Sequence, residues 1–214
     1  MKKLMLMLLV MCLMVGSASA TPLALVNGGF EAGVPAGWSS ADFTGWSNAT
    51  GTNAIIDATA NHTEGIYSLM FDVTAGGGTA QFMQATSHVV QEGYTYTLST
   101  DARSLVVNNL GCTQFLEAIL LDDGVNPLVQ AAGGAFNAGT TQVFGDDAWR
   151  TYSVSFTASA ADAGKTITFY IAAQGSGTNK YGWVDNVQLD AVPEPATVSL
   201  IALGGLTLLR RKRK

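Results

Sequence analysis

The chain has 214 residues, of which 48% are hydrophobic and 13% are charged, about half of the roughly 25% charged residues typical of soluble domains. The formal net charge is −5, but residues 21–192 carry four basic and fifteen acidic residues, a net charge of −11. A body this acidic repels phosphate backbones, which argues against a nucleic acid as partner.

The first 20 residues have the pattern of a secretory signal helix. Lys2 and Lys3 give it a positive start, and residues 4–15 form an apolar run that is too short to span a bilayer but suits a signal peptide. Small residues at Ala18 and Ala20 predict that signal peptidase cuts after Ala20. Residues 1–20 are therefore expected to be removed from the mature protein.

Residues 21–192 have the size of one domain and show no sustained helical periodicity. Short runs of β-forming residues alternate with clusters of Gly, Asn, Asp and Thr. In chain order, the predicted strands cover residues 23–26, 54–57, 68–73, 79–85, 94–99, 117–122, 153–156, 166–171 and 182–189. This spacing predicts an all-β fold, an antiparallel sandwich.

The last 22 residues have a different pattern. Pro193, Glu194 and Pro195 precede an apolar run at 196–209, and residues 210–214 are all basic. A helix over the apolar run is about 21 Å long, and snorkelling of the basic tail extends it toward the roughly 30 Å of a hydrocarbon core. The positive-inside rule places the basic tail in the cytoplasm and the acidic body outside. A buried core helix is the alternative, which five adjacent cations disfavour.

These features together resemble the PEP-CTERM sorting signal of bacterial exported proteins. The resemblance implies that residues 193–214 are a sorting address read by an exosortase, a membrane transpeptidase thought to cut near Pro193-Glu194-Pro195. It also implies an exported protein that reaches the cell surface or extracellular matrix. Until it is sorted, a short C-terminal transmembrane helix is expected to anchor it in the inner membrane.

Short motifs at both ends of the body carry a second resemblance. Residues 27–31 (Asn-Gly-Gly-Phe-Glu) and 37–38 (Gly-Trp) open the body, and residues 183–189 (Trp-Val-Asp-Asn-Val-Gln-Leu) close it. Residues 65–69 and 149–158 fit the same pattern, which resembles the galactose-binding-like jelly roll of carbohydrate-binding modules of families 4, 9 and 22. The implied fold is an antiparallel jelly-roll sandwich whose first and last strands bring Phe30 and Val187 together.

In the modules that the body resembles, acidic positions equivalent to Glu31 and Asp185 often hold a structural calcium ion. Calcium takes six to eight oxygen ligands, so two carboxylates need help, which the loop 61–65 with Glu64 is expected to supply. The alternative is that Glu31 and Asp185 accept backbone N–H groups and hold the closing strand. The sequence leaves both interpretations open.

Sugar binding requires aromatic rings that stack on a pyranose, and amides or carboxylates that bond its hydroxyl groups. Trp38, Trp149 and Trp183 lie inside the fold motifs and are expected to pack in the core. Trp46 stands beside Gly45 and Ser47, and Tyr181 follows Lys180 and a loop of Gly, Ser, Thr and Asn, so these two are the predicted exposed ligand contacts. The alternative for both is that they cover an edge of the sandwich.

The sequence offers little for catalysis. It has two histidines, His62 and His88, and contains neither an H-E-x-x-H nor a G-x-S-x-G motif. The prediction is a non-catalytic exported protein with a structural or adhesive role and polysaccharide contact. The alternatives are a dedicated carbohydrate-binding module and a small glycan-active enzyme, which needs two carboxyl groups about 5–10 Å apart in a pocket.

Overall fold

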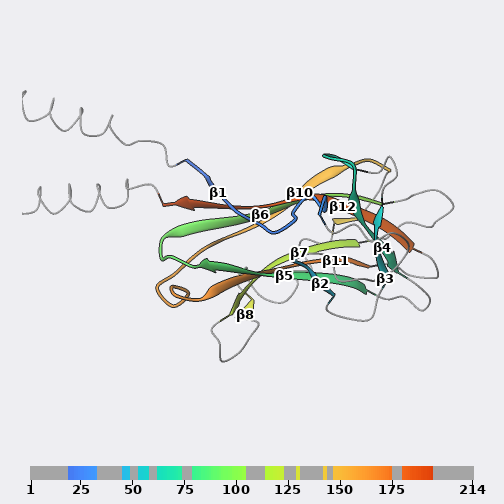
Figure 1. Ribbon diagram of the computed structural model, residues 1–214. Helices are drawn as coiled ribbons and strands as arrows, with labels where there is room; N and C mark the ends of the chain where they lie inside the picture. Colours follow the sequence, from blue (N-terminus) through green and yellow to red (C-terminus); the bar gives the residue numbers. More distant parts are fainter. Residues whose placement is uncertain are drawn as a thin grey trace, which may run out of the picture.

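The computed structural model describes residues 19–32, 45–48, 53–57, 62–73, 79–104, 114–122, 129–130, 142–143, 147–174 and 180–194. All regular structure in these ranges is β (Figure 1). The strands are β1 (Thr21–Leu23), β2 (Ser47–Asn48), β3 (Asn53–Asp57), β4 (Ser68–Val73), β5 (Thr79–Val89), β6 (Tyr94–Ser104), β7 (Gln114–Asp122), β8 (Val129–Gln130), β9 (Gln142–Val143), β10 (Arg150–Thr157), β11 (Thr166–Gln174) and β12 (Lys180–Pro193).

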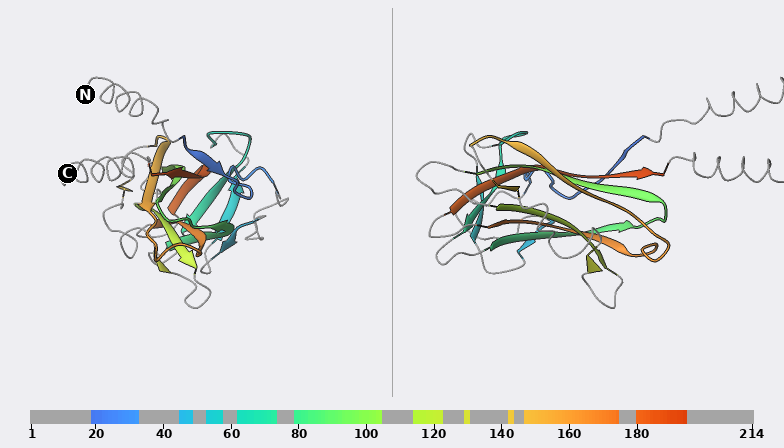
Figure 2. Two further views of the ribbon diagram at one scale, coloured as in Figure 1. Left: turned by 90° about the vertical axis from the view of Figure 1, so that its left-hand side faces the viewer. Right: turned by 180° about the vertical axis from the view of Figure 1, so that it is seen from behind.

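The strands form two antiparallel sheets that face each other (Figures 1 and 2). Sheet A has the order β10-β6-β12-β4-β3, with β1 also paired to β12. Sheet B has the order β2-β5-β11-β7-β8, with β9 also paired to β7. The predicted all-β sandwich is confirmed, and its arrangement is consistent with a jelly roll.

The core lies between the sheets and follows from the two-residue period of the strands. Alternate residues of β6 are buried, while the residues between them are hydroxylated or charged. Each sheet contributes its inward-facing side chains to one cluster, which includes Leu98, Ala102, Ile119, Leu121, Phe169 and Ile171. The alternation that predicted the strands therefore also identifies the faces that meet.

The first and last strands close the domain, as the motifs predicted. Strand β1 pairs with β12 so that Leu23 lies opposite Leu189, and Phe30 and Val187 are buried in the same core cluster. The Val187 N–H donates to the Gly28 carbonyl at 3.0 Å. A Cβ on residue 28 would collide with the Val187 carbonyl, so this contact needs glycine.

A bulge in β12 decides what its side chains face. The register against β6 shifts between Asp185 and Gln188, and Asn186 has φ of 49°. Val184 points into the core before the bulge, and Val187 does so after it. Asp185 faces outward by alternation with Val184, and the bulge keeps Asn186 on the same outer face of sheet A, where the candidate site residues gather.

Some predictions fall on residues outside the described ranges. These include the signal helix, the C-terminal helix at 196–209, and Trp38. Within the described ranges, no helix is long and apolar enough to cross a bilayer. The strand predicted at 23–26 is found two residues earlier, at Thr21–Leu23.

Candidate functional site

Asp185 fastens a loop to the outer face of sheet A. Its side chain is fully buried, and Oδ2 accepts hydrogen bonds from the Thr63 N–H at 2.7 Å, the Thr63 hydroxyl at 3.0 Å and the Glu64 N–H at 3.0 Å. Its Oδ1 accepts the Asn186 N–H at 2.8 Å. Four donors therefore converge on one carboxylate, which joins residues 63–64 to β12.

Glu31 holds the other end of the same loop. Its Oε1 accepts the backbone N–H groups of Ile66 and Tyr67, each at 2.9 Å. Gly65 lies between residues 63–64, which Asp185 holds, and residues 66–67, which Glu31 holds. Its φ is +59°, and a Cβ there would collide with the Glu31 carboxylate. The backbone-anchoring interpretation of Glu31 and Asp185 is thus the arrangement that the structure displays.

Glu64 lies in a negative environment. Its carboxylate approaches Gly29, where a Cβ would collide with Oε1. Partial burial raises the pKa of Glu64, and the charges of Asp185, Glu31 and Asp101 raise it further. We call Glu31, Glu64, Asp101 and Asp185 the carboxylate cluster.

Three members of the carboxylate cluster, Glu31, Glu64 and Asp185, were also the predicted calcium site. Calcium needs six to eight oxygens, but Asp185 Oδ2 already accepts three hydrogen bonds and Glu31 Oε1 accepts two. In the part of the chain that the structure describes, no group of three or more His, Cys, Asp or Glu side chains is arranged to hold a metal ion. As placed, these residues fit a backbone anchor better than a cation site, and calcium binding stays a prediction.

A row of polar side chains crosses the same face from β10 to β12. Asp101 accepts the Thr151 hydroxyl at 2.6 Å through Oδ1 and the Asn186 amide at 3.1 Å through Oδ2. The Asn186 side-chain oxygen in turn accepts the amide of Gln188, which is exposed. We call Thr151, Asp101, Asn186 and Gln188 the polar row.

Aromatic side chains lie beside the polar row. Tyr181 and Trp183 are two residues apart on β12, so both project from the outer face, and Tyr181 is half-buried. The Arg103 guanidinium lies 5.7 Å from the centre of the Trp183 ring and bonds Asp147 at 2.8 Å. Because Trp183 is 6% exposed, Tyr181 is the more accessible of the two rings.

The predicted exposure of Trp46 is wrong. Its side chain is 4% exposed, and its ring centre lies 5.2 Å from those of Phe30 and Phe169. The indole N–H donates to the Asn27 carbonyl at 3.1 Å. Small polar neighbours suggested a surface position, but the turn at Gly45, with φ of +84°, is followed by an indole that fills the space between the sheets.

Two features of sheet B were missed. Ala118, Leu120, Tyr170 and Ala172 form a second buried apolar cluster on the face turned away from the core. Glu117 points the other way, into the core, where burial raises its pKa to about 8. The signal for the outer cluster was the unbroken apolar run of β7 at 118–121, which is typical of a strand covered on both faces.

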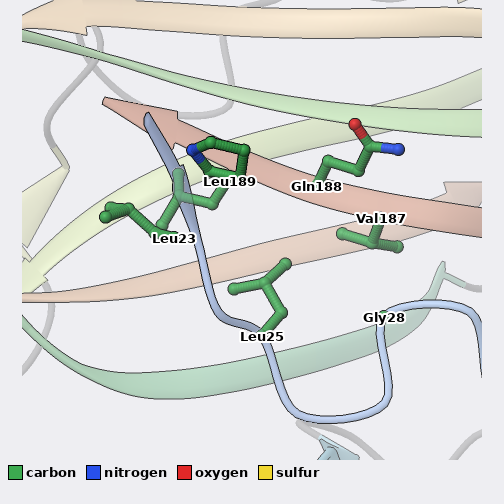
Figure 3. Close-up of a pocket in the computed structure, with 7 residues that line it drawn as sticks. Leu23, Leu25, Gly28, Val187, Gln188 and Leu189 are labelled. Carbon is green, nitrogen blue, oxygen red and sulfur yellow. The ribbon is translucent and has the colours of Figure 1, made fainter. Parts of the chain in front are cut away.

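A small pocket lies beside the closing strands. It has a volume of about 190 Å³ and lies between β12 and the chain that runs from β1 to Gly28 (Figure 3). Leu23 and Leu25 form one side, and Val187 and Leu189 form the other. The lining contains no carboxylate, so this pocket does not supply the acid pair that glycoside cleavage requires.

The predicted sorting motif begins within the described structure. Pro193 is the last residue of β12 and lies opposite Tyr94. The Glu194 N–H donates to the Gly93 carbonyl at 2.6 Å. Pro195 and the residues after it lie outside the described ranges.

Two family models match the chain. One, described as a carbohydrate binding domain, matches residues 24–181, and the other, the PEP-CTERM protein-sorting motif, matches residues 191–214. Both resemblances that the motifs predicted are therefore confirmed. No curated protein sequence matches the chain.

Solved structures share the fold at low sequence identity. The Stig cyclase Fisc from Fischerella sp. TAU is 20% identical, with a TM-score of 0.62 over 82% of this chain and 100% of that chain. The CBM22-1 xylan-binding domain of Xyn10C from Paenibacillus barcinonensis is 13% identical, with a TM-score of 0.53 over 83% of this chain and 97% of that chain. At these identities the likeness shows the fold alone.

Proposed function

The chain belongs to the carbohydrate binding domain family, and from this premise we propose that it is an exported protein that contacts polysaccharide. The sorting motif at 191–214 supports a route through signal peptidase and an exosortase-type transpeptidase to the cell surface or matrix. In this proposal residues 1–20 are a signal peptide, 21–192 the delivered domain and 193–214 the sorting signal. The C-terminal helix anchors the protein in the inner membrane until it is processed.

We place the polysaccharide contact on the outer face of sheet A. The observation that carries this proposal is that Tyr181 and the polar row lie on the same face of sheet A. Gln188, the last member of the polar row, is exposed. A half-buried phenol ring can stack on the apolar face of a sugar, and amide and carboxylate groups can bond its hydroxyls. Tyr181 therefore keeps its proposed ligand role, whereas the buried ring of Trp46 has no free face to offer.

The charge of the domain narrows the class of polysaccharide. Residues 21–192 carry a net charge of −11, and the carboxylate cluster adjoins the proposed contact. Polymers rich in carboxylate or sulfate are repelled by such a field. We therefore propose a neutral polysaccharide as the partner.

We propose that the role is structural or adhesive, without catalysis. Glu31 Oε1 and both carboxylate oxygens of Asp185 accept backbone N–H groups, which leaves these atoms poorly suited to proton transfer. The cyclase and the xylan-binding domain both have this fold, so the fold does not decide between catalysis and binding. The dedicated carbohydrate-binding module and the glycan-active enzyme remain the alternatives.

A glycan array probed with the full-length protein in detergent tests the proposal. We expect binding to neutral glycans, weakened about tenfold or more by Tyr181→Ala, since a stacked ring and its hydrogen bonds contribute on the order of 1.4 kcal/mol or more. Val89→Ala, an exposed position on β5 in sheet B, is the matched control and should bind like the wild type. Binding of no glycan by the wild-type protein would refute the contact.

The same array separates the alternatives. A single preferred oligosaccharide, lost with Tyr181→Ala, identifies a dedicated binding module with a defined sugar site. Release of reducing ends from a bound glycan identifies an enzyme. Broad binding to one class of polymer, without release, supports the structural or adhesive role.

A further inference from the structure

The sorting motif and the folded domain share residues. The motif match begins at residue 191, whereas β12 continues to Pro193. Ala191 is 4% exposed and belongs to the core cluster, so the start of the motif is part of the sandwich. The boundary between domain and signal therefore lies inside a strand.

The last residues of β12 are held by β6 and the turn before it. Glu194 bonds the Gly93 carbonyl, which makes Pro193 and Tyr94 a non-hydrogen-bonded pair. The Pro193 nitrogen therefore does not face β6, and its missing N–H leaves no gap in the ladder. Pro193 thus ends the strand without removing a hydrogen bond to β6, and the backbone N–H of Glu194 still bonds the Gly93 carbonyl.

The acceptor of this bond is itself fixed. The Gly93 N–H donates to the Ala158 carbonyl at 2.9 Å, and the Ala158 N–H donates to the Tyr94 carbonyl at 2.8 Å. On the opposite edge of β12, Thr21 lies directly across from Ala191. The residue that follows the predicted signal-peptide cleavage thus pairs with the residue at which the sorting motif begins.

We propose that the folded sandwich masks the front of its own sorting motif, and that a processing enzyme reaches Pro193 and Glu194 after they detach from Tyr94 and Gly93. This inference rests on the proposed sorting function. A peptide must enter a protease or transpeptidase cleft as a free extended segment, and a strand paired to its neighbours cannot do so. The exposed Glu194 side chain is available for recognition while its backbone is not.

The opening that this mechanism needs is small. Detaching Glu194 breaks one backbone hydrogen bond, whereas detaching Ala191 would expose a core residue and break its pairing with Thr21. Ends of strands open with far lower free energy than cores. The opening is therefore expected to stop at residue 192 and to leave the domain folded.

Two linker variants of the full-length protein in detergent test the inference. In the first, a Gly-Ser-Gly-Ser-Gly-Ser linker between Val192 and Pro193 moves Glu194 away from Gly93. The matched control carries the same linker between Pro195 and Ala196, which keeps the terminal pairing and adds the same length. Thermal melting checks that both variants are folded.

Amide exchange at Glu194 provides the readout, because this N–H donates the terminal hydrogen bond to Gly93. We expect the first linker to accelerate this exchange by about tenfold or more, and the control linker to leave it near the wild-type rate, because only the first removes the paired state. Equal rates in all three proteins would overturn the inference. Slow amide exchange at Glu194 in the wild type and in the control variant, with fast exchange in the first linker variant, would support it.

Membrane release in cells distinguishes failure of the inference from failure of the proposed function. If residues 193–214 are not processed, no form loses its C-terminal mass, while the protection of Glu194 in detergent still stands. If the motif is processed but not masked, the linker before Pro193 leaves the rate of release unchanged. We expect that linker to accelerate release, since it preserves the spacing between the motif and the apolar run.

Discussion

Asp185 Oδ2 accepts the Thr63 N–H at 2.7 Å, although the two residues are 122 positions apart in the chain. Together with the bonds from Glu31 to Ile66 and Tyr67, this contact ties the loop before β4 to the closing strand and to the first motif of the domain. The acidic residues of these motifs therefore join three distant parts of the chain.

Replacing Asp185 with alanine is expected to destabilise the domain by about 3 kcal/mol, because four part-buried donors lose their acceptor. Urea denaturation of the purified protein measures the change. Asp147→Asn is the control, since its ion pair with Arg103 is partly exposed and should contribute less than about 1 kcal/mol. Similar losses in both variants would contradict the anchoring role of Asp185.

Gly65→Ala is expected to destabilise the protein by about 2 kcal/mol or more, since the Cβ meets the Glu31 carboxylate at a backbone with φ of +59°. Gly93→Ala and Gly164→Ala are matched controls, because both have positive φ but no atom within 4 Å of the added Cβ. They should lose only about 1 kcal/mol, the contribution of the backbone alone. The difference in unfolding free energy therefore isolates the collision with Glu31.

A chelator distinguishes the two interpretations of the carboxylate cluster. With both oxygens of Asp185 and Oε1 of Glu31 occupied by N–H groups, we expect the melting temperature to be the same in EDTA and in millimolar calcium. A ligand that binds only the folded state must raise that temperature. A higher melting temperature in the presence of calcium, lost in the Glu64→Gln variant, would establish the cation site instead.

Glu117 makes stability depend on pH. Burial raises its pKa to about 8 from an ordinary value near 4.5, so the folded state holds this proton more tightly than the unfolded chain. The protonated Glu117 therefore contributes fully to the free energy of unfolding below about pH 4.5. This contribution is lost as pH rises toward 8, by at most about 1.4 kcal/mol per pH unit. Urea denaturation at several pH values should show this slope in the wild type.

The Glu117→Gln variant should lack the slope. The Thr100 hydroxyl lies close enough to lower the Glu117 pKa slightly, but neither Thr100 Oγ1 nor Glu117 Oε1 makes a hydrogen bond of regular geometry. The neutral amide removes the titration and keeps the size of the side chain. A slope that persists in this variant would assign the pH dependence to other groups.

The sequence predicted the parts of the fold that repeat locally. The alternation in β6 and the chain-end motifs identified strands, the closing pair, and the two acidic side chains that meet at one loop. Trp46 was misjudged because its small neighbours describe a turn, whereas its burial depends on Phe30 and Phe169 from distant segments. Short strands such as β8, with two residues, have no period to detect and owe their pairing to β7.

The pairing of Thr21 with Ala191 also determines how the domain bears mechanical load. The chain enters β1 and leaves β12 at the same end of sheet A (Figure 1). Pulling these two points apart would therefore separate β1 from β12 one hydrogen bond at a time. A polymer that pulls on β6 and β10 through Asp101 and Thr151 while the C-terminus is tethered would instead draw β12 lengthwise past β6. That geometry loads many of the hydrogen bonds between β6 and β12 at once, so the same sheet resists the second force better than the first.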